Sequence, residues 1–320
     1  LEGFGLPASR PAQAPGRYAR WMDDIKAYHR GEKDLKAYDS LEGVAARLMR
    51  LDHAQTAHAM GIAEYHGPRS QMMRCIDHPT MLKDGSGWGA MCGVSAARLA
   101  ARGFTGAPAL TLSTDHWRDL GDTWLICQQY FKPYPVCRWA QAPIAAVLEL
   151  QKRHGFDSRA ITGLHIVSFH ESVRLGTKQV TTTEEAQYST SFPCALALVH
   201  GTVLPEHVAE AALDHPEVQR LSSILTMGED AAANKAFPIR RMARAEITLA
   251  AGNRLQSDWF EPEWDPTDPP SKEDLEAKFF NYAGPVLGLA RSQATHRAVE
   301  ALDHTATAQP LLDLLAQPIS

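Results

Sequence analysis

The sequence lacks three features that would place it in a familiar class of protein. It has no basic stripe of the kind that binding to nucleic-acid phosphates requires, because the formal net charge is −5 and the lysines and arginines are scattered among acidic residues. Its five cysteines stand far apart without the CxxC pair of a zinc or iron–sulfur site. We therefore expect no nucleic-acid partner, no metal, and reduced thiols that are mostly buried.

Long apolar runs are also missing. No stretch approaches the unbroken apolar length that spans a bilayer. The first 20 residues carry proline and arginine where a signal peptide would have its apolar core. These two absences predict a cytoplasmic protein without a membrane partner.

What the chain contains is an ordinary globular composition. Its 320 residues are 44% hydrophobic and 22% charged, which suffices for two domains and a sizeable core. Residues 1–20 combine prolines and glycines without periodicity and are expected to form a loosely ordered arm.

Helical patterns dominate the first half. Apolar residues recur at helical spacing over residues 41–51, and Asp52 with Gln55 has the pattern of a capping box that opens a second helix. A fourth helix is predicted from Arg138 to His154, before Gly155.

The third helix is predicted from about Gly87 to Arg102, with Gly103 as its C-terminal cap. Two sets of residues support it. The first set shares an apolar face and comprises Trp88, Met91, Cys92, Ser95 and Leu99. The second set is small enough for close helix contact and comprises Gly89, Gly93, Ala96 and Ala97.

Strand patterns appear after Gly155. Residues 160–169 and 244–259 are strand-like, and a Gly-Asn pair in the middle of the second stretch predicts a hairpin. Helices are expected between these strands and after them, over residues 186–200, 206–213 and 214–225, and again from Lys272.

The predicted fold class is therefore α+β, with a mostly helical domain interrupted by a smaller α+β lid domain. The helical domain is expected over residues 1–156 and the lid over 157–266. Residues 267–320 are expected to return to the helical domain as C-terminal helices.

The stretch "LKDGSGWGA" places Lys83 in front of three closely spaced glycines where a helix is predicted to begin. A helix N-terminus offers unpaired N–H groups, and glycines let an anion approach the backbone. The lysine precedes the glycines, so this is not a P-loop. The pattern predicts a carboxylate or phosphate receptor built from Lys83, Asp84, Gly85 and Ser86, and an ordinary turn with a cap is the alternative.

A second cationic stretch, "FKPYPVCR", also enters a predicted helix. Pro133 and Pro135 restrict their neighbours to extended conformations, so Lys132, Tyr134 and Arg138 are expected on a stiff segment. The alternative is a connection between helices with solvated side chains. Together the two stretches predict a pocket for a small polyanion.

Five blocks of the sequence, taken in order, resemble the MmgE/PrpD family, which contains 2-methylcitrate dehydratase, cis-aconitate decarboxylase and iminodisuccinate epimerase. The resemblance implies a mostly helical domain with an α+β lid, an active site between them, no metal or organic cofactor, and a homodimer. The blocks are residues 51–73, 81–108, 129–150, 181–201 and 268–288.

The same resemblance implies roles for single residues. Lys83 and Lys132 match two family lysines that line the cleft, whereas Ser86 stands where many members have a histidine. Phe192 stands where some members have an active-site tyrosine. The N-terminal region is shorter than in family members, and His29 stands near the place of a family histidine.

The chemistry of these substrates gives the expected mechanism. Removal of a proton next to a carboxylate creates a dianionic species, which Lys83 and Lys132 would stabilise. His29 is the predicted base, and His66 is the alternative. Loss of water, loss of CO2, or return of the proton to the other face would give a dehydratase, a decarboxylase or an epimerase.

The sequence therefore predicts a metal-independent, cofactor-free lyase of the 2-methylcitrate dehydratase type, which acts on a small di- or tricarboxylate. One alternative is an epimerase or isomerase of the same family. Another is a shortened, non-catalytic homologue that binds carboxylates or serves as a partner subunit.

Overall fold

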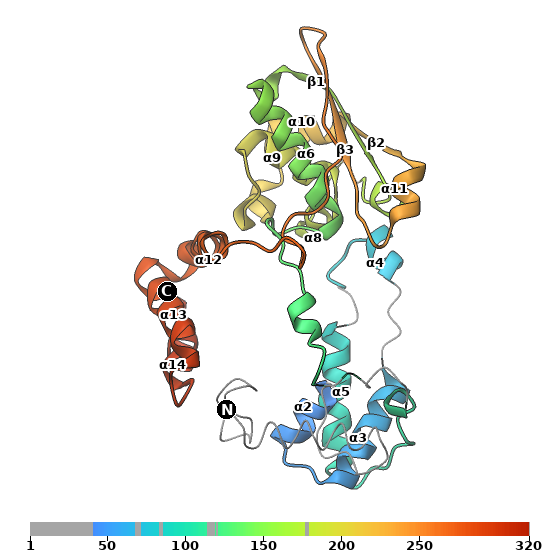
Figure 1. The fold of residues 1–320 in the computed structure, drawn as a ribbon, viewed down its shortest axis with the longest axis vertical. Helices are drawn as coiled ribbons and strands as arrows, with labels where there is room; N and C mark the ends of the chain where they lie inside the picture. Colours follow the sequence, from blue (N-terminus) through green and yellow to red (C-terminus); the bar gives the residue numbers. More distant parts are fainter. Residues whose placement is uncertain are drawn as a thin grey trace. The chain divides into compact units, whose positions relative to one another are not determined.

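The computed structural model has an α+β fold, mostly helical with one four-stranded sheet, as predicted (Figure 1). The chain forms two compact units. The first comprises residues 1–71, 83–127 and 286–320, and the second comprises 72–82 and 128–285. The structure describes residues 41–67, 72–82, 86–113, 119, 121–176 and 179–319.

Three helices pack together in the first unit, namely α2 (Leu41–Leu48), α3 (His53–His66) and α5 (Ser86–Ala100). The predicted capping box opens α3. The Gln55 N–H donates to the Asp52 carboxylate at 2.8 Å, and the Gln55 side chain accepts from the Asp52 N–H at 3.1 Å. Gly103 follows α5 with a φ of 85°, in agreement with the predicted cap.

The face that α5 buries is its small-residue face. Ala96, Ala97 and Ala100 are fully buried against α2 and α3. Trp88 and Met91, which belong to the predicted apolar face, are 55% and 52% exposed. Small side chains allow the helices to approach closely, so the alanine face packs and the bulky face stays outside.

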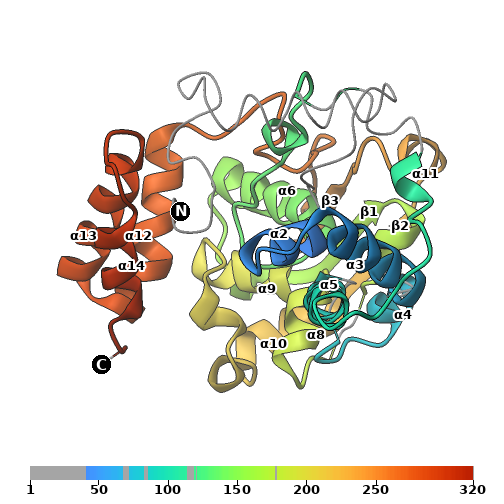
Figure 2. The same cartoon turned by 90° about the horizontal axis from the view of Figure 1, so that it is seen from below.

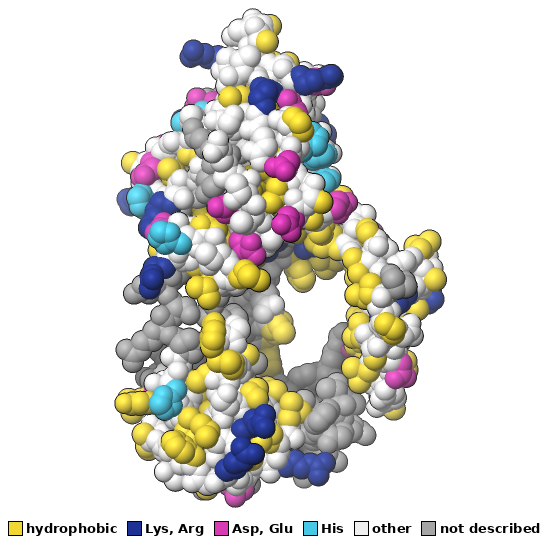
Figure 3. Space-filling model, turned by 180° about the vertical axis from the view of Figure 1, so that it is seen from behind, with side chains coloured by type: hydrophobic (Ala, Val, Ile, Leu, Met, Phe, Trp, Pro, Cys, Tyr) yellow, Lys and Arg dark blue, Asp and Glu magenta, His cyan; other side chains and the backbone are white. Residues whose placement is uncertain are grey.

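The C-terminal helices α13 (Leu289–Glu300) and α14 (Gln309–Ala316) also belong to the first unit. Arg291 joins them, because its guanidinium donates to the carbonyls of Leu314 and Gln317, each at 2.7 Å. These bonds satisfy carbonyls that the end of α14 leaves without helical partners. Figure 3 shows hydrophobic side chains over the surface of the C-terminal helices.

The second unit is built on a mixed sheet in the order β2-β1-β3-β4. Strand β1 pairs in parallel with β2 and antiparallel with β3, and β3 pairs antiparallel with β4. The β3–β4 hairpin turns at Gly252, where φ is 86°, so the predicted hairpin is confirmed. The strands are β1 (Ile161–Ser168), β2 (Leu225–Glu229), β3 (Arg244–Leu249) and β4 (Arg254–Gln256).

Three helices cover one face of this sheet (Figures 1 and 2). They are α6 (Arg138–His154), α9 (Ser191–His200) and α10 (Pro216–Ile224). Alternate strand residues such as Ile166 and Ile247 point into the core that these helices close. On the opposite face, residues such as His165 and Glu246 line an open hollow of about 500 Å³.

A smaller apolar cluster of the second unit surrounds Trp139. Its ring meets Phe169 and Phe237 edge-to-face at centroid distances of 5.7 Å. Arg174 pairs with Asp77 at the end of α4, a segment that lies between α3 and α5 in the sequence. The cluster draws on α4 (Met72–Asp77), on α11 (Ala231–Ala236) and on Phe169 and Leu175, which flank α7 (His170–Val173).

Three predictions in this unit were wrong in detail. The helix expected over 186–200 is broken into α8 (Thr183–Tyr188) and α9, since Ser189 turns the chain and its hydroxyl accepts from the Phe192 N–H at 3.1 Å. The helix expected over 206–213 is two 3-10 turns. Strand β2 was not foreseen. Among the described residues, the 3-10 turns are η2 (Thr111–Ser113), η4 (Leu125–Gln128), η5 (Ser158–Ala160), η6 (Pro205–Val208), η7 (Glu210–Ala212) and η8 (Ala301–Asp303).

Helix α6 begins at Arg138 and ends before Gly155, as predicted, and the N–H of Gly155 donates to the carbonyl of Gln151 at 2.8 Å. Helix α6 belongs to the second unit, together with the sheet. The expected three-part division at residues 156 and 266 stays a prediction. Helix α12 (Lys272–Leu287) begins after Ser271, whose hydroxyl accepts from the Asp274 N–H at 3.1 Å as an N-cap.

All five cysteines are free thiols, as predicted, but only Cys194 is buried; Cys127 is exposed. In the part of the chain that the structure describes, no helix is both long and apolar enough to cross a membrane.

Candidate functional site

Several predicted site residues lie outside the described residues. These are His29, Lys83, Asp84 and Gly85, and the side chain of Ser86 is not described either. The backbone of Ser86 begins α5, so the glycine-rich stretch does lead into a helix. The roles expected for these residues stay predictions.

The "FKPYPVC" segment has no regular secondary structure, yet side chains satisfy its backbone. The amide of Gln141 is its main clamp. Its nitrogen donates to the carbonyls of Tyr134 at 3.2 Å and of Val136 and Cys137 at 3.3 Å. Its oxygen accepts from the Tyr134 N–H at 3.2 Å. Gln141 is 2% exposed and therefore holds the segment from within.

Helix α12 supplies two more anchors to the same segment. The ammonium of Lys278 donates to the carbonyl of Lys132, and the Tyr282 hydroxyl donates to that of Pro133 at 3.3 Å. Lys278 and Tyr282 are four residues apart and so share one face of α12. The segment is thus fixed by side chains as well as stiffened by its prolines, as the sequence predicted.

Two lysines come together here. The ammonium of Lys132 donates to the carbonyl of Val136 at 3.0 Å, while that of Lys278 donates to the carbonyl of Lys132 itself. Burial, and then the nearby charge of Lys132, lowers the pKa of Lys278. The rings of Trp264 and Tyr282 lie 5.9 and 5.3 Å from the Lys278 ammonium. The result is a half-buried pair of cations beside aromatic rings.

Two tyrosines border this lysine pair, and both keep their protons near neutral pH. Burial, and then the charge of Glu263, raises the pKa of Tyr134 to about 12. Burial also raises the pKa of Tyr282 to about 12, with the charges of Tyr134 and Glu206 as smaller causes. A neutral phenol can donate a hydrogen bond to an anion.

Arg138, at the first position of α6, is buried with 6% exposure. Its Nη2 atom pairs with the Asp265 carboxylate, and its guanidinium carbon lies 3.5 Å from the centre of the Tyr130 ring. Burial lowers the pKa of Arg138, and the charges of Asp265 and Tyr130 oppose that effect. Tyr134, Arg138 and Lys132 thus all belong to the second unit.

Phe192 lies in the core, whereas His66 lies at the surface. Phe192 is fully buried in α9 within the main core. His66 is the exposed last residue of α3, with its ring edge-on to Tyr65 at 5.0 Å. A histidine at the C-terminal end of a helix interacts favourably with the helix dipole when protonated.

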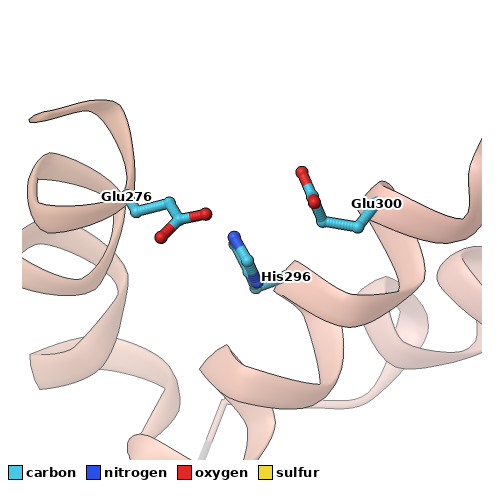
Figure 4. A group of neighbouring side chains, drawn as sticks. All are labelled: Glu276, His296 and Glu300. Atoms are coloured by element: carbon cyan, nitrogen blue, oxygen red, sulfur yellow. The ribbon is translucent and has the colours of Figure 1, made fainter. Parts of the chain in front are cut away.

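Another cluster of polar side chains lies on the C-terminal helices (Figure 4). His296 and Glu300 are four residues apart on α13, one helical turn from each other. Glu276 is on the part of α12 that belongs to the second unit and pairs with Lys272 at 3.6 Å. His296 and Glu300 give α13 two ligand atoms, fewer than the three or four that protein zinc sites use, and Glu276 belongs to the other unit.

Sequence reasoning missed Lys278 and Tyr282. Both lie in the block over residues 268–288 that carries part of the family resemblance, but no single residue there was assigned a role. Their spacing of four places them on one helix face, which was the available signal. Only the tertiary structure brings that face to a segment about 146 residues earlier in the chain.

Comparison with protein families supports the same resemblance. The MmgE/PrpD N-terminal domain matches residues 41–124, and the MmgE/PrpD C-terminal domain matches residues 134–304. A comparison with curated proteins gave no match. The matched regions cover most of the chain. The C-terminal match includes Tyr134, Arg138 and Lys278, and Lys132 lies two residues before it. The chain therefore belongs to the MmgE/PrpD family.

Proposed function

We propose that the protein is a metal-independent lyase of the dehydratase type, which removes a proton next to a carboxylate of a small di- or tricarboxylate such as 2-methylcitrate. Membership of the family supports a dehydratase, a lyase or a related activity. The observation that carries the proposal is the pair of half-buried ammonium groups of Lys132 and Lys278, fixed by the same backbone segment.

The lysine pair has the electrostatics that such a reaction needs. Proton loss next to a carboxylate places a second negative charge on the substrate, and preorganised cations stabilise this charge in the transition state. Burial, and then repulsion by the charge of Lys132, lowers the pKa of Lys278. A carboxylate bound between them would relieve that repulsion. The protonated phenol of Tyr134 would add a neutral donor.

The proposal also names a base and an outcome of the reaction. His29 is the proposed base, and Lys83 is the proposed further contact to the substrate, both from the family resemblance. Loss of water is the proposed outcome, and return of the proton by an epimerase or isomerase is the alternative. The proposed assembly is a homodimer in the cytoplasm.

Proton NMR in heavy water, with EDTA present, tests the activity. The substrates are 2-methylcitrate, citrate, cis-aconitate and iminodisuccinate, and both turnover and deuterium wash-in are followed. Lys132→Ala and Lys278→Ala should each lower kcat/KM by roughly 10²–10³, the effect of removing one preorganised donor. Lys152→Ala, an exposed residue near the end of α6, is the matched control.

The result decides between an enzyme and a binding protein. Turnover that persists in EDTA and falls in the two lysine variants supports the metal-independent lyase. Carboxylate binding without turnover or deuterium exchange for any of the four substrates would contradict it and would favour the non-catalytic homologue.

A further inference from the structure

Two contacts bring the beginning of α6 to a segment far along the chain. The N–H of Phe131 donates to the carbonyl of Trp264 at 3.1 Å. Seven residues later, Arg138 pairs with Asp265. Residues 131–138 therefore lie beside residues 264–265 within the second unit.

A third segment, which carries Arg241, meets the same place. Ala243 and Phe260 form an antiparallel bridge, with N–H to carbonyl distances of 2.8 and 2.9 Å in the two directions. Met242 packs in the same apolar cluster as Trp139, the neighbour of Arg138. Arg241 and Arg138 are thus each followed in the chain by a residue of this one apolar cluster.

The guanidinium of Arg138 retains donors that are buried without an acceptor. Its Nη2 donates to Asp265, but among the described residues nothing accepts from its buried Nε and Nη1 atoms. A buried donor without an acceptor is costly, which makes such donors rare in native proteins. Cys137 gives α6 no side-chain cap, so the partial positive charge of the helix N-terminus adds to that of Arg138.

Arg241 repeats this pattern. Its Nε atom is buried, and no described residue accepts from it. Its charge also lowers the pKa of Arg138, after the larger effect of burial. Only one carboxylate, that of Asp265, pairs with Arg138 among the described residues. The positive charge and the N–H donors here exceed the acceptors.

We propose that Arg138 and Arg241 bind a carboxylate group of the substrate. This inference rests on the proposed function and assigns residues to a second carboxylate of its substrate, because the lysine pair binds another carboxylate. The substrate then carries at least two carboxylates. A planar guanidinium matches a planar carboxylate in a bidentate geometry, which a lysine does not offer.

Calorimetry with tricarballylate, a tricarboxylate without a hydroxyl to eliminate, tests the arginine pair independently of turnover. Arg241→Gln should weaken binding by about tenfold or more, because it removes hydrogen bonds to a charged group. Arg240→Gln is the matched control, since Arg240 is exposed and pairs with Glu261. It should leave the affinity within about twofold, as exposed ion pairs contribute little.

A second readout follows Arg138 without changing it. In ¹⁵N spectra of the arginine side chains, the Nε signal of Arg138 should shift and its proton should exchange more slowly on addition of tricarballylate.

A variant of Arg138 tests the geometry of the contact. Arg138→Lys keeps the charge but loses the fork of donors, so it should also weaken binding. Circular dichroism and a thermal melt check that each variant is folded.

The possible results separate this inference from the proposed function. Unchanged affinity in Arg241→Gln with no shift of the Arg138 Nε signal would overturn the inference, and so would a wild-type protein that does not bind tricarballylate. Loss of affinity in Arg241→Gln supports the arginine site even where no substrate is turned over. Turnover by the wild type with an unaltered KM in Arg241→Gln would leave the lyase in place and reject the site.

Discussion

Lys278 donates a hydrogen bond from its ammonium group to the backbone carbonyl of Lys132, and burial, followed by the charge of Lys132, lowers the pKa of Lys278. The two lysines are therefore coupled both by a backbone contact and through space. One comes from the segment before α6 and the other from α12, so the fold itself concentrates positive charge in the second unit.

The first prediction follows from this coupling. Lys132→Met should raise the pKa of Lys278 toward its ordinary value, because the second cause of its depression is removed while burial, the first cause, remains. Titration of the lysine side chains by ¹⁵N NMR measures the shift. Lys235→Met, on the exposed end of α11, is the control and should leave the Lys278 titration in place. An unmoved titration in Lys132→Met would contradict the coupling.

The second prediction concerns the clamp of the "FKPYPVC" segment. Gln141→Leu should lower the free energy of unfolding by about 2–4 kcal/mol, since it leaves the N–H and the carbonyl of Tyr134 without their partner and removes one donor each from the carbonyls of Val136 and Cys137. Gln151→Leu, on the same helix, removes one side-chain bond to the carbonyl of Leu198 and should cost about 1 kcal/mol. Urea unfolding measures both. Equal losses of stability in the two variants would show that the hydrogen bonds of Gln141 together contribute no more than the single bond of Gln151.

Much of this fold could be predicted from local signals. The capping box at Asp52, the start of α6 at Arg138 and the hairpin turn at Gly252 each depend on residue types within a few positions, and the structure has all three. Strand β2 gave no such signal. It lies at the edge of the sheet, so its five residues pair on one side only and show no strict alternation.

The errors share a physical cause, which is that tertiary packing chose between local alternatives. In α5 both a bulky face and a small-residue face fit a helix, and close approach to α3 selected the small one. Local signals likewise indicated only some of the residues of the proposed site. The proline-rich stretch pointed to Lys132 and Arg138, but Lys278 and Arg241 are distant in sequence and only folding brings them there.

The third prediction tests close packing in the first unit. A Cβ atom added to Gly61 in α3 would lie 1.6 Å from the carbonyl oxygen of Ala107, so Gly61→Ala should cost about 1–3 kcal/mol or more through overpacking. Gly89→Ala in α5 meets nothing within 4 Å and should stabilise the helix by about 0.5–1 kcal/mol. Thermal melts measure the opposite signs. A Gly61→Ala variant as stable as the wild type would show that residues 106–107 do not lie against α3.

The fourth prediction addresses the base of the proposed reaction. His29→Gln should abolish deuterium exchange at the substrate carbon and leave binding nearly unchanged, because glutamine has a similar volume but takes up no proton near neutral pH. Wash-in from heavy water isolates this step whichever product forms. His66→Gln is the comparison, and exchange that survives in His29→Gln but is lost in His66→Gln would move the assignment to the end of α3.

The fifth prediction concerns three histidines that meet in the second unit. The ring of His200 stacks on that of His207 at 4.2 Å and meets that of His215 edge-on at 5.4 Å. Burial, then the charges of His207 and His215, lowers the pKa of His200 from 6.5. Acidic residues of the elements packed here are Glu206 in η6, Glu210 in η7, Asp214 in the turn before α10, and Glu217, which pairs with Arg220.

The sign of the pH effect follows from this direction. With a folded pKa below the unfolded one, the unfolded chain binds the proton more readily, so the contribution of His200 to stability is fully present above about pH 6.5 and is lost as the pH falls through the folded pKa. His200→Gln should therefore reduce the loss of stability on acidification, as measured by urea unfolding between about pH 5 and 8. The double variant His207→Gln/His215→Gln should raise the pKa of His200, read by NMR. A His200→Gln protein with the same pH dependence as the wild type would show that this cluster does not bias folding.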